Sequence, residues 1–245
     1  MANSIRAVLA GQAKGKVRAI TALFTAFACI ALTGVAQAHG VAESDQAFIE
    51  GSSGINIGPY MYLGAKHMVT GYDHLLFLAG VVFFLYRMKD VGIYVTLFAI
   101  GHSTTLLLGT IFDIRANPYI VDAIIGLSVA YKAFDNIDGF TTLFGWRPDP
   151  KKAVLVFGLF HGFGLATKLQ DLTLSQDGLI PNLLAFNVGV EMGQFMALGI
   201  ILILMNLWRF SPSFQRSAIA ANAALMCAGF ILVGYQMTGY MTQGA

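Results

Sequence analysis

The feature that most constrains this chain is a series of long apolar runs with few charged residues between them. Only 11% of its 245 residues are charged and 56% are hydrophobic, whereas about a quarter of the residues in a soluble domain are charged. A helix needs about 20 apolar residues to cross the hydrocarbon core of a bilayer. We therefore predict an all-α, polytopic membrane helix bundle.

Six such runs follow residue 58, separated by short segments that carry charge, glycine or proline. We place them at 60–87, 91–112, 118–138, 152–171, 181–208 and 217–240. No long linker divides the runs into two groups, so residues 59–245 are predicted to form one domain of six transmembrane helices.

A further apolar run lies close to the start of the chain. It extends from Ala19 to Val35, follows four basic residues within 6–18, and ends in Ala36-Gln37-Ala38. This order is typical of a cleaved signal peptide, here residues 1–38, and an uncleaved first helix is the alternative. Residues 39–58 are polar, acidic and glycine-rich, which predicts an exported N-terminal tail or loop.

The basic residues between the runs predict an orientation. With the mature N-terminus outside, the outer loops contain only Arg115 and Lys168, and the inner loops contain Arg87, Lys89, Arg147, Lys151, Lys152, Arg209 and Arg216. An excess of positive charge is typical of cytoplasmic loops. We therefore expect a protein of a bacterial-type inner (plasma) membrane, embedded in the lipid bilayer, with both mature termini outside. A net charge of +2 and the lack of a basic, aromatic-rich run argue against a nucleic-acid partner.

Ionisable residues inside the predicted spans are the candidates for function. An Asp at a helix centre costs on the order of 2.5–3.5 kcal/mol on insertion scales, so such residues normally face the bundle interior. Near the middle of their spans lie Asp73, His74, His102 and His161. Glu191 lies between the middle and the outer end of its span, and we expect it to turn inward.

His67 and His74 are seven residues apart, so on one continuous helix they would share a face and lie roughly 10 Å apart. This spacing predicts a ladder of ligands that runs inward from the outer surface. The polar residues Asn187, Glu191 and Gln194 follow a similar helical spacing on the fifth run.

Imidazoles and carboxylates suit a borderline divalent ion such as Ni²⁺, Co²⁺ or Zn²⁺, whereas Cu(I) would favour Cys or Met and is the weaker alternative. The predicted metal ligands are His67, Asp73, His74, His102, His161 and Glu191. Possible accessory ligands are Asp122, Asn187, Gln194 and His39, which becomes the N-terminal residue if cleavage follows Ala38.

These residues also have structural alternatives. His67 could be an interfacial residue at a helix end, Asp73-His74 a pair that fixes helix packing, and His102 a hydrogen-bond partner of neighbouring backbone. Asp122 could cap a helix that begins near Asn117-Pro118. The glycines at 158, 162 and 164 predict close packing against another helix, and Asp135 and Asp138 are expected to be solvated at the inner end.

An ordered set of segments resembles the HupE/UreJ family of accessory membrane proteins. It comprises His67 with Asp73-His74, "FAIGHSTTLLLG" at 98–109, "VDAIIGLSVAYKAFDN" at 121–136, "FGLFHGFGLATKL" at 157–169 and "FNVGVEMGQ" at 186–194. The family is regarded as nickel or cobalt permeases associated with hydrogenase and urease maturation. The resemblance therefore implies metal transport and, as a partner, a metalloenzyme maturation system or membrane complex.

One part of the pattern departs from the better-studied nickel branch, which resembles Phe-His-Gly-x-Ala-His-Gly-x-Glu in the fourth run. This chain keeps Phe160-His161-Gly162 but has Leu165 and Lys168 where a second His and a Glu would fall. It is closer to a second, less characterised branch.

Together these observations predict a permease for a divalent transition metal ion of the Ni²⁺/Co²⁺ type. Two alternatives remain open at the level of the sequence: an intramembrane zinc-dependent hydrolase, and a non-transporting metal-binding accessory subunit of a membrane complex. We expect a transporter rather than an enzyme, because no separate general base and no substrate-binding signature are visible.

Overall fold

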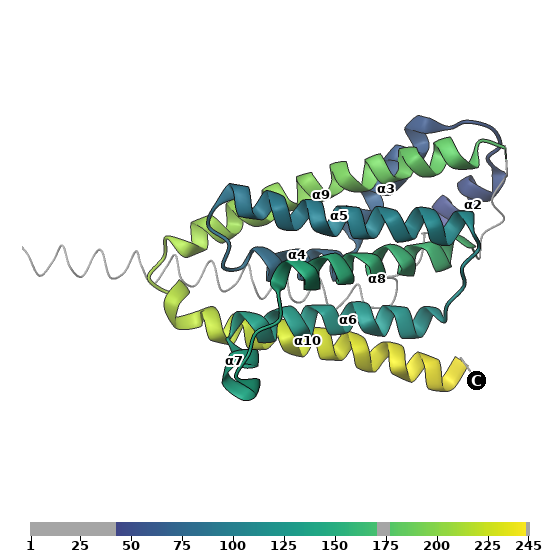
Figure 1. The fold of residues 1–245 in the computed structure, drawn as a ribbon. Coiled ribbons are helices and arrows are strands. Elements are labelled where there is room, and N and C mark those ends of the chain that lie inside the picture. Colours follow the sequence, from purple (N-terminus) through teal and green to yellow (C-terminus); the bar gives the residue numbers. More distant parts are fainter. Residues whose placement is uncertain (1–42, 171–176, 244–245) are drawn as a thin grey trace, which may run out of the picture.

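A computed structural model describes residues 43–170 and 177–243, which fold into helices joined by short turns, with no strand in this part of the chain (Figure 1). The helices are α2 (Glu43–Gly51), α3 (Ile57–Thr70), α4 (Tyr72–Val82), α5 (Met88–Ile111), α6 (Pro118–Asn136), α7 (Gly139–Phe144), α8 (Pro150–Gln170), α9 (Leu179–Arg209) and α10 (Phe214–Gln243). The predicted all-α class is confirmed. The predicted signal peptide, residues 1–38, lies outside the described residues.

Four of the described helices are long and apolar enough to cross a membrane, namely α5, α8, α9 and α10. The predicted span 60–87 is divided between α3 and α4, and neither half reaches that length. The helix α6 matches the predicted span 118–138 in position, but it contains the three charged residues Asp122, Lys132 and Asp135.

Residues 43–51, predicted to belong to an exported tail or loop, form the short helix α2. One side of this helix is held against the bundle, because Ile49 is buried in the core and the ring of Phe48 lies 6.4 Å from that of Tyr60. An ion pair of 2.8 Å joins Asp45 to Lys66 of α3. The packing of one apolar stripe therefore stabilises a helix that the polar composition of the segment did not predict.

The long helices pack as three pairs, α3 with α9, α5 with α8, and α6 with α10 (Figure 1). Glycines allow the backbones within each pair to approach closely. A Cβ atom would lie 2.6 Å from the Ala65 carbonyl oxygen if added at Gly193, 2.6 Å from the Phe98 carbonyl oxygen if added at Gly158, and 2.5 Å from the Ala130 amide nitrogen if added at Gly229. The predicted close packing around His161 is confirmed, since Gly158 and Gly162 face α5 and Gly164 faces α6.

The helix α6 begins at a defined cap. The Asn117 side chain accepts hydrogen bonds from the amides of Tyr119 and Ile120, at 3.0 and 3.3 Å, and Pro118 occupies the first turn. The alternative that Asp122 caps this helix is therefore wrong, because Asn117 already satisfies the first amides.

The C-terminal end of α6 is joined to its neighbours by polar contacts. Asp135, expected to be solvated, is instead buried and accepts hydrogen bonds from Lys132 and Arg147, each at 2.6 Å. The Asp135 carboxylate raises the pKa of Arg147, because it hydrogen bonds to the charged guanidinium. Asp138 is exposed, as expected. The buried Lys132 and the more exposed Arg147 thus explain why a carboxylate is tolerated at this position.

Candidate metal centre

The centre is built around a break in the first predicted span. At Gly71 the backbone leaves the helical region, with φ −71° and ψ 97°, and its amide donates to the His67 carbonyl oxygen at 2.8 Å. A Cβ atom at this position would lie 2.9 Å from Nδ1 of His74 and 3.2 Å from Oδ1 of Asp73. The space available at the break therefore requires glycine.

This break brings two histidines together. His67 lies in the last turn of α3, and His74 lies in the first turn of α4. Their ring centroids are 5.2 Å apart. The predicted ladder, with roughly 10 Å between these residues, is wrong because it assumed one continuous helix. The two rings meet edge to face across the break.

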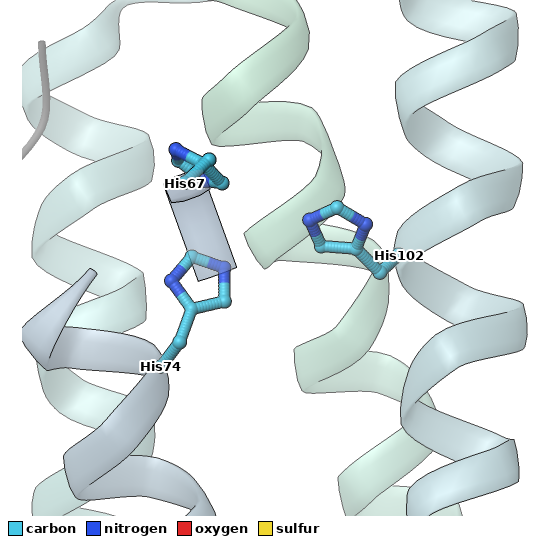
Figure 2. A group of neighbouring side chains, drawn as sticks. All are labelled: His67, His74 and His102. Atoms are coloured by element: carbon cyan, nitrogen blue, oxygen red, sulfur yellow. The ribbon is translucent and has the colours of Figure 1, made fainter. Parts of the chain in front are cut away.

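A third histidine approaches from α5 and completes the group. Figure 2 shows the rings of His67, His74 and His102 around a common space. One ligand nitrogen from each ring lies within 4.8 Å of the other two. His74 and His102 are 3% and 1% exposed, and His67 is half-buried. Three imidazoles at this separation form a group that could hold a metal ion.

Hydrogen bonding at His74 leaves one nitrogen directed to this space. Its Nδ1 lies 3.0 Å from Oδ1 of the buried Asp73, while its Nε2 has no hydrogen-bond partner among the described residues. Neither ring nitrogen of His102 has a partner there either. A buried polar atom without a partner costs about 1–3 kcal/mol, and coordination of a cation would remove that cost. The geometry around His74 matches the carboxylate–histidine–metal arrangement of many metal sites.

His161 lies beside this group without belonging to it. Its ring centroid is 5.0 Å from that of His74, and its Nδ1 lies 2.8 Å from the Phe157 carbonyl oxygen. If Nδ1 carries the proton, it donates to that carbonyl and Nε2 is the nitrogen with the lone pair. His161 is fully buried and is therefore placed to act as a further ligand or to orient the group.

Aromatic rings that were not among the predicted site residues pack beside the group. Phe77 and Phe98 are each 1% exposed, and their ring centroids each lie 5.1 Å from that of His161. Phe157 packs on Phe77 at 5.9 Å. Each of these rings lies three or four residues along its helix from a histidine, at positions 74, 102 and 161. This spacing is the signal that relates them to the site.

Three further predicted ligands come from α9, which carries none of the three histidines. Glu191 is exposed, so the expectation that it turns inward is wrong, and it lines a hollow between α5 and α9. Gln194 is buried in the same hollow, and Asn187 is buried with its amide group 3.3 Å from the Leu183 carbonyl oxygen. His39 lies outside the described residues.

Asp122, a possible accessory ligand in the sequence, forms an ion pair instead. Its carboxylate is bound by Lys168 of α8 at 2.9 Å, and both groups are largely buried. Leu165 is 3% exposed in the hydrophobic core. The two positions that depart from the nickel-branch pattern therefore serve packing and an interhelical ion pair in this chain, and neither contributes a metal ligand.

Comparison with known proteins agrees with this description. The model of the family described as HupE / UreJ protein matches residues 43–244. No curated protein and no solved structure matches the chain. The chain therefore belongs to the HupE/UreJ family, a family of transporter-like membrane proteins to which nickel and cobalt transport is ascribed.

Proposed function

We propose that this protein is a membrane permease for a divalent transition metal ion of the Ni²⁺/Co²⁺ type. The observation that carries the proposal is the convergence of His67, His74 and His102, three imidazoles from three helices, at a break in an apolar segment. Polar groups in such a position are costly unless they have a function.

The ligand chemistry supports a borderline ion. Imidazole nitrogen suits Ni²⁺, Co²⁺ and Zn²⁺, whereas Cu(I) prefers sulfur. Asp73 carries the negative charge nearest to the group and acts through His74, which it orients. We therefore assign His67, His74 and His102 as ligands, Asp73 as the residue that positions His74, and His161 as a candidate fourth ligand.

We further propose that six segments cross the membrane, α3 with α4 as one, then α5, α6, α8, α9 and α10. The loops before α5, α8 and α10 gather at one end of the bundle (Figure 1). These loops and the adjoining helix ends carry Arg87, Lys89, Arg147, Lys151, Lys152, Arg209 and Arg216. This charge favours the cytoplasmic side for that end and an inner-membrane location. Broken helices near the bilayer midplane are typical of substrate sites in transporters, which supports the assignment of the break at Gly71.

In this arrangement the ion reaches the histidines from the outer side, and the rings of Phe77 and Phe98 separate it from the inner side. Release inward then requires these rings to move. The family resemblance makes a metalloenzyme maturation system the consumer of the ion that we propose.

The test is metal accumulation in cells that express the full chain. His102→Ala should reduce Ni²⁺ or Co²⁺ accumulation to the level of cells without the protein, because it removes the ligand from α5. Thr238→Ala, an exposed change on α10, is the control and should accumulate metal like the wild type. Unchanged accumulation by a membrane-inserted His102→Ala variant would contradict the proposal.

A further inference from the structure

Glu191 presents a carboxylate where an apolar helix face is expected. Its neighbours on the outward face of α9 include Leu184, Val188 and Phe195, which are all exposed. Within residues 43–170 and 177–243, Glu191 has neither a hydrogen-bond nor an ion-pair partner. A carboxylate on a face of this kind costs several kcal/mol unless a counter-charge or water compensates it.

A hollow of about 370 Å³ lies beside this carboxylate, between α5 and α9. Its polar lining consists of oxygen-bearing side chains. Glu191 and Gln194 come from α9, and Ser103, Thr104 and Thr96 come from α5. Among the residues that the structure describes, no histidine and no cysteine lines it. This set of donors differs in kind from the nitrogen donors of the histidine group.

The buried member of this lining has an oxygen available. Gln194 is 1% exposed, and its amide nitrogen makes only a long contact of 3.5 Å with the Val95 carbonyl oxygen. Its amide oxygen has no hydrogen-bond partner among the described residues, and neither has the Ser103 hydroxyl. Thr104 donates its proton to the Ile100 carbonyl oxygen at 2.7 Å, so its hydroxyl oxygen can only accept a further contact.

Oxygen donors of this kind are those that hard cations prefer. One carboxylate balances one positive charge, so a monovalent ion would leave the hollow neutral, whereas a divalent ion would leave an uncompensated charge in an apolar region. We propose that Glu191, Gln194, Ser103 and Thr104 form a second cation site, which takes a hard monovalent ion of the Na⁺ type.

The position of this site links it to the histidine group. Ser103 follows His102 directly on α5, and Gly193, next to Gln194, packs against Ala65 of α3. An ion held between α5 and α9 would therefore restrain α5, which carries His102, and, through the packing of α9, also α3, which carries His67. The proposal that the hollow binds Na⁺ does not depend on metal transport. The proposal that bound Na⁺ drives metal uptake rests on the proposed function.

Direct binding of ²²Na⁺ to the purified full chain, without any transition metal and at fixed pH, tests the proposal. The wild type should bind Na⁺ saturably. Bound ²²Na⁺ should fall when a K⁺ salt replaces the other added salt, because K⁺ competes for the site. Glu191→Gln should abolish saturable binding, and Ser103→Ala should weaken it several-fold. Glu50→Gln makes the same chemical change on an exposed residue of α2 and should bind like the wild type.

Retention of Ni²⁺ or Co²⁺ binding by Glu191→Gln would show that this variant is folded. Absence of saturable ²²Na⁺ binding in the wild type overturns the proposal, as does equal binding by Glu191→Gln. Metal uptake that follows a proton gradient in a chain that binds no Na⁺ also overturns it. Because the assay contains no transition metal, a failure here is distinct from a failure of metal transport.

Discussion

At His74 the two ring nitrogens have separate tasks. Nδ1 lies 3.0 Å from the Asp73 carboxylate, and Nε2 has no hydrogen-bond partner among the described residues. The carboxylate fixes both the ring orientation and the tautomer, which makes Nε2 the nitrogen with the lone pair. The chemistry of the group therefore depends on a residue that need not touch the ion.

Replacement of Asp73 by Asn tests this dependence. The side chain keeps its size but loses the charge that stabilises the proton on Nδ1, so affinity for Co²⁺ or Ni²⁺ should fall roughly ten- to hundred-fold. Isothermal titration of the purified protein measures this change.

The control is Asp90→Asn, which alters an aspartate that is 41% exposed and lies 3.9 Å from Arg87. It should bind metal with wild-type affinity. A folded Asp73→Asn variant with undiminished affinity would show that Asp73 has only a packing role.

For single residues, the sequence correctly predicted that the histidines at 74, 102 and 161 are buried, but it did not predict that Glu191 is exposed. The cost of an ionisable group in an apolar segment selects positions 74, 102 and 161, and all three are buried. Helical spacing relates residues within one helix only. It could not show that the stripe at Asn187, Glu191 and Gln194 lies at the edge of a contact, with the middle residue facing outward.

Among the elements, the break between α3 and α4 matters most. A Cβ atom at Gly71 would lie 2.9 Å from Nδ1 of His74 and 3.1 Å from the His67 carbonyl oxygen. Hydropathy treats residues 60–87 as one segment and cannot detect this break. The sequence signal was the single glycine between His67 and Asp73, but its effect depends on contacts that form only in the folded chain.

Gly71→Ala should therefore displace His74 and reduce Co²⁺ affinity at least ten-fold, since the added methyl group occupies the space beside Nδ1. Gly92→Ala is the matched control, because a Cβ atom there meets nothing within 4 Å. Titration of the two variants with Co²⁺ measures both affinities. Equal affinities would mean that the break does not set the geometry of the site.

The ion pair between Asp122 of α6 and Lys168 of α8 supports a second prediction at this scale. Their side chains are 5% and 17% exposed, so removal of one charge leaves the other largely buried without its partner. Lys168→Met should destabilise the protein by about 3–5 kcal/mol. The double variant Asp122→Asn with Lys168→Met should recover part of that loss, because no buried charge is left alone.

Reversible unfolding in mixed micelles measures these differences in the free energy of unfolding. A double variant less stable than Lys168→Met alone would contradict the assigned pairing. Wild-type metal affinity in the double variant would further show that this pair, which includes Lys168 at a position where the nickel branch differs, is structural.

For the whole molecule, the positions of the helices were largely predictable and their pairing was not. Apolar length places α5, α8, α9 and α10 close to the predicted spans. Glycines at positions such as 158 and 193 mark helix faces that can pack closely against another helix. They do not show which helix packs there. The convergence of the three histidines from α3, α4 and α5 depends in the same way on how separate helices pack in the folded chain.

The most direct test of the central claim is metal flux into liposomes that contain the purified full chain. Flux of Ni²⁺, Co²⁺, Zn²⁺ and Cu⁺ would be compared for the wild type, His74→Ala and the exposed control Asp138→Asn. Our account predicts Ni²⁺ or Co²⁺ flux for the wild type and the control, and only the leak of protein-free vesicles for His74→Ala. Flux through a folded His74→Ala variant at the wild-type rate would contradict it.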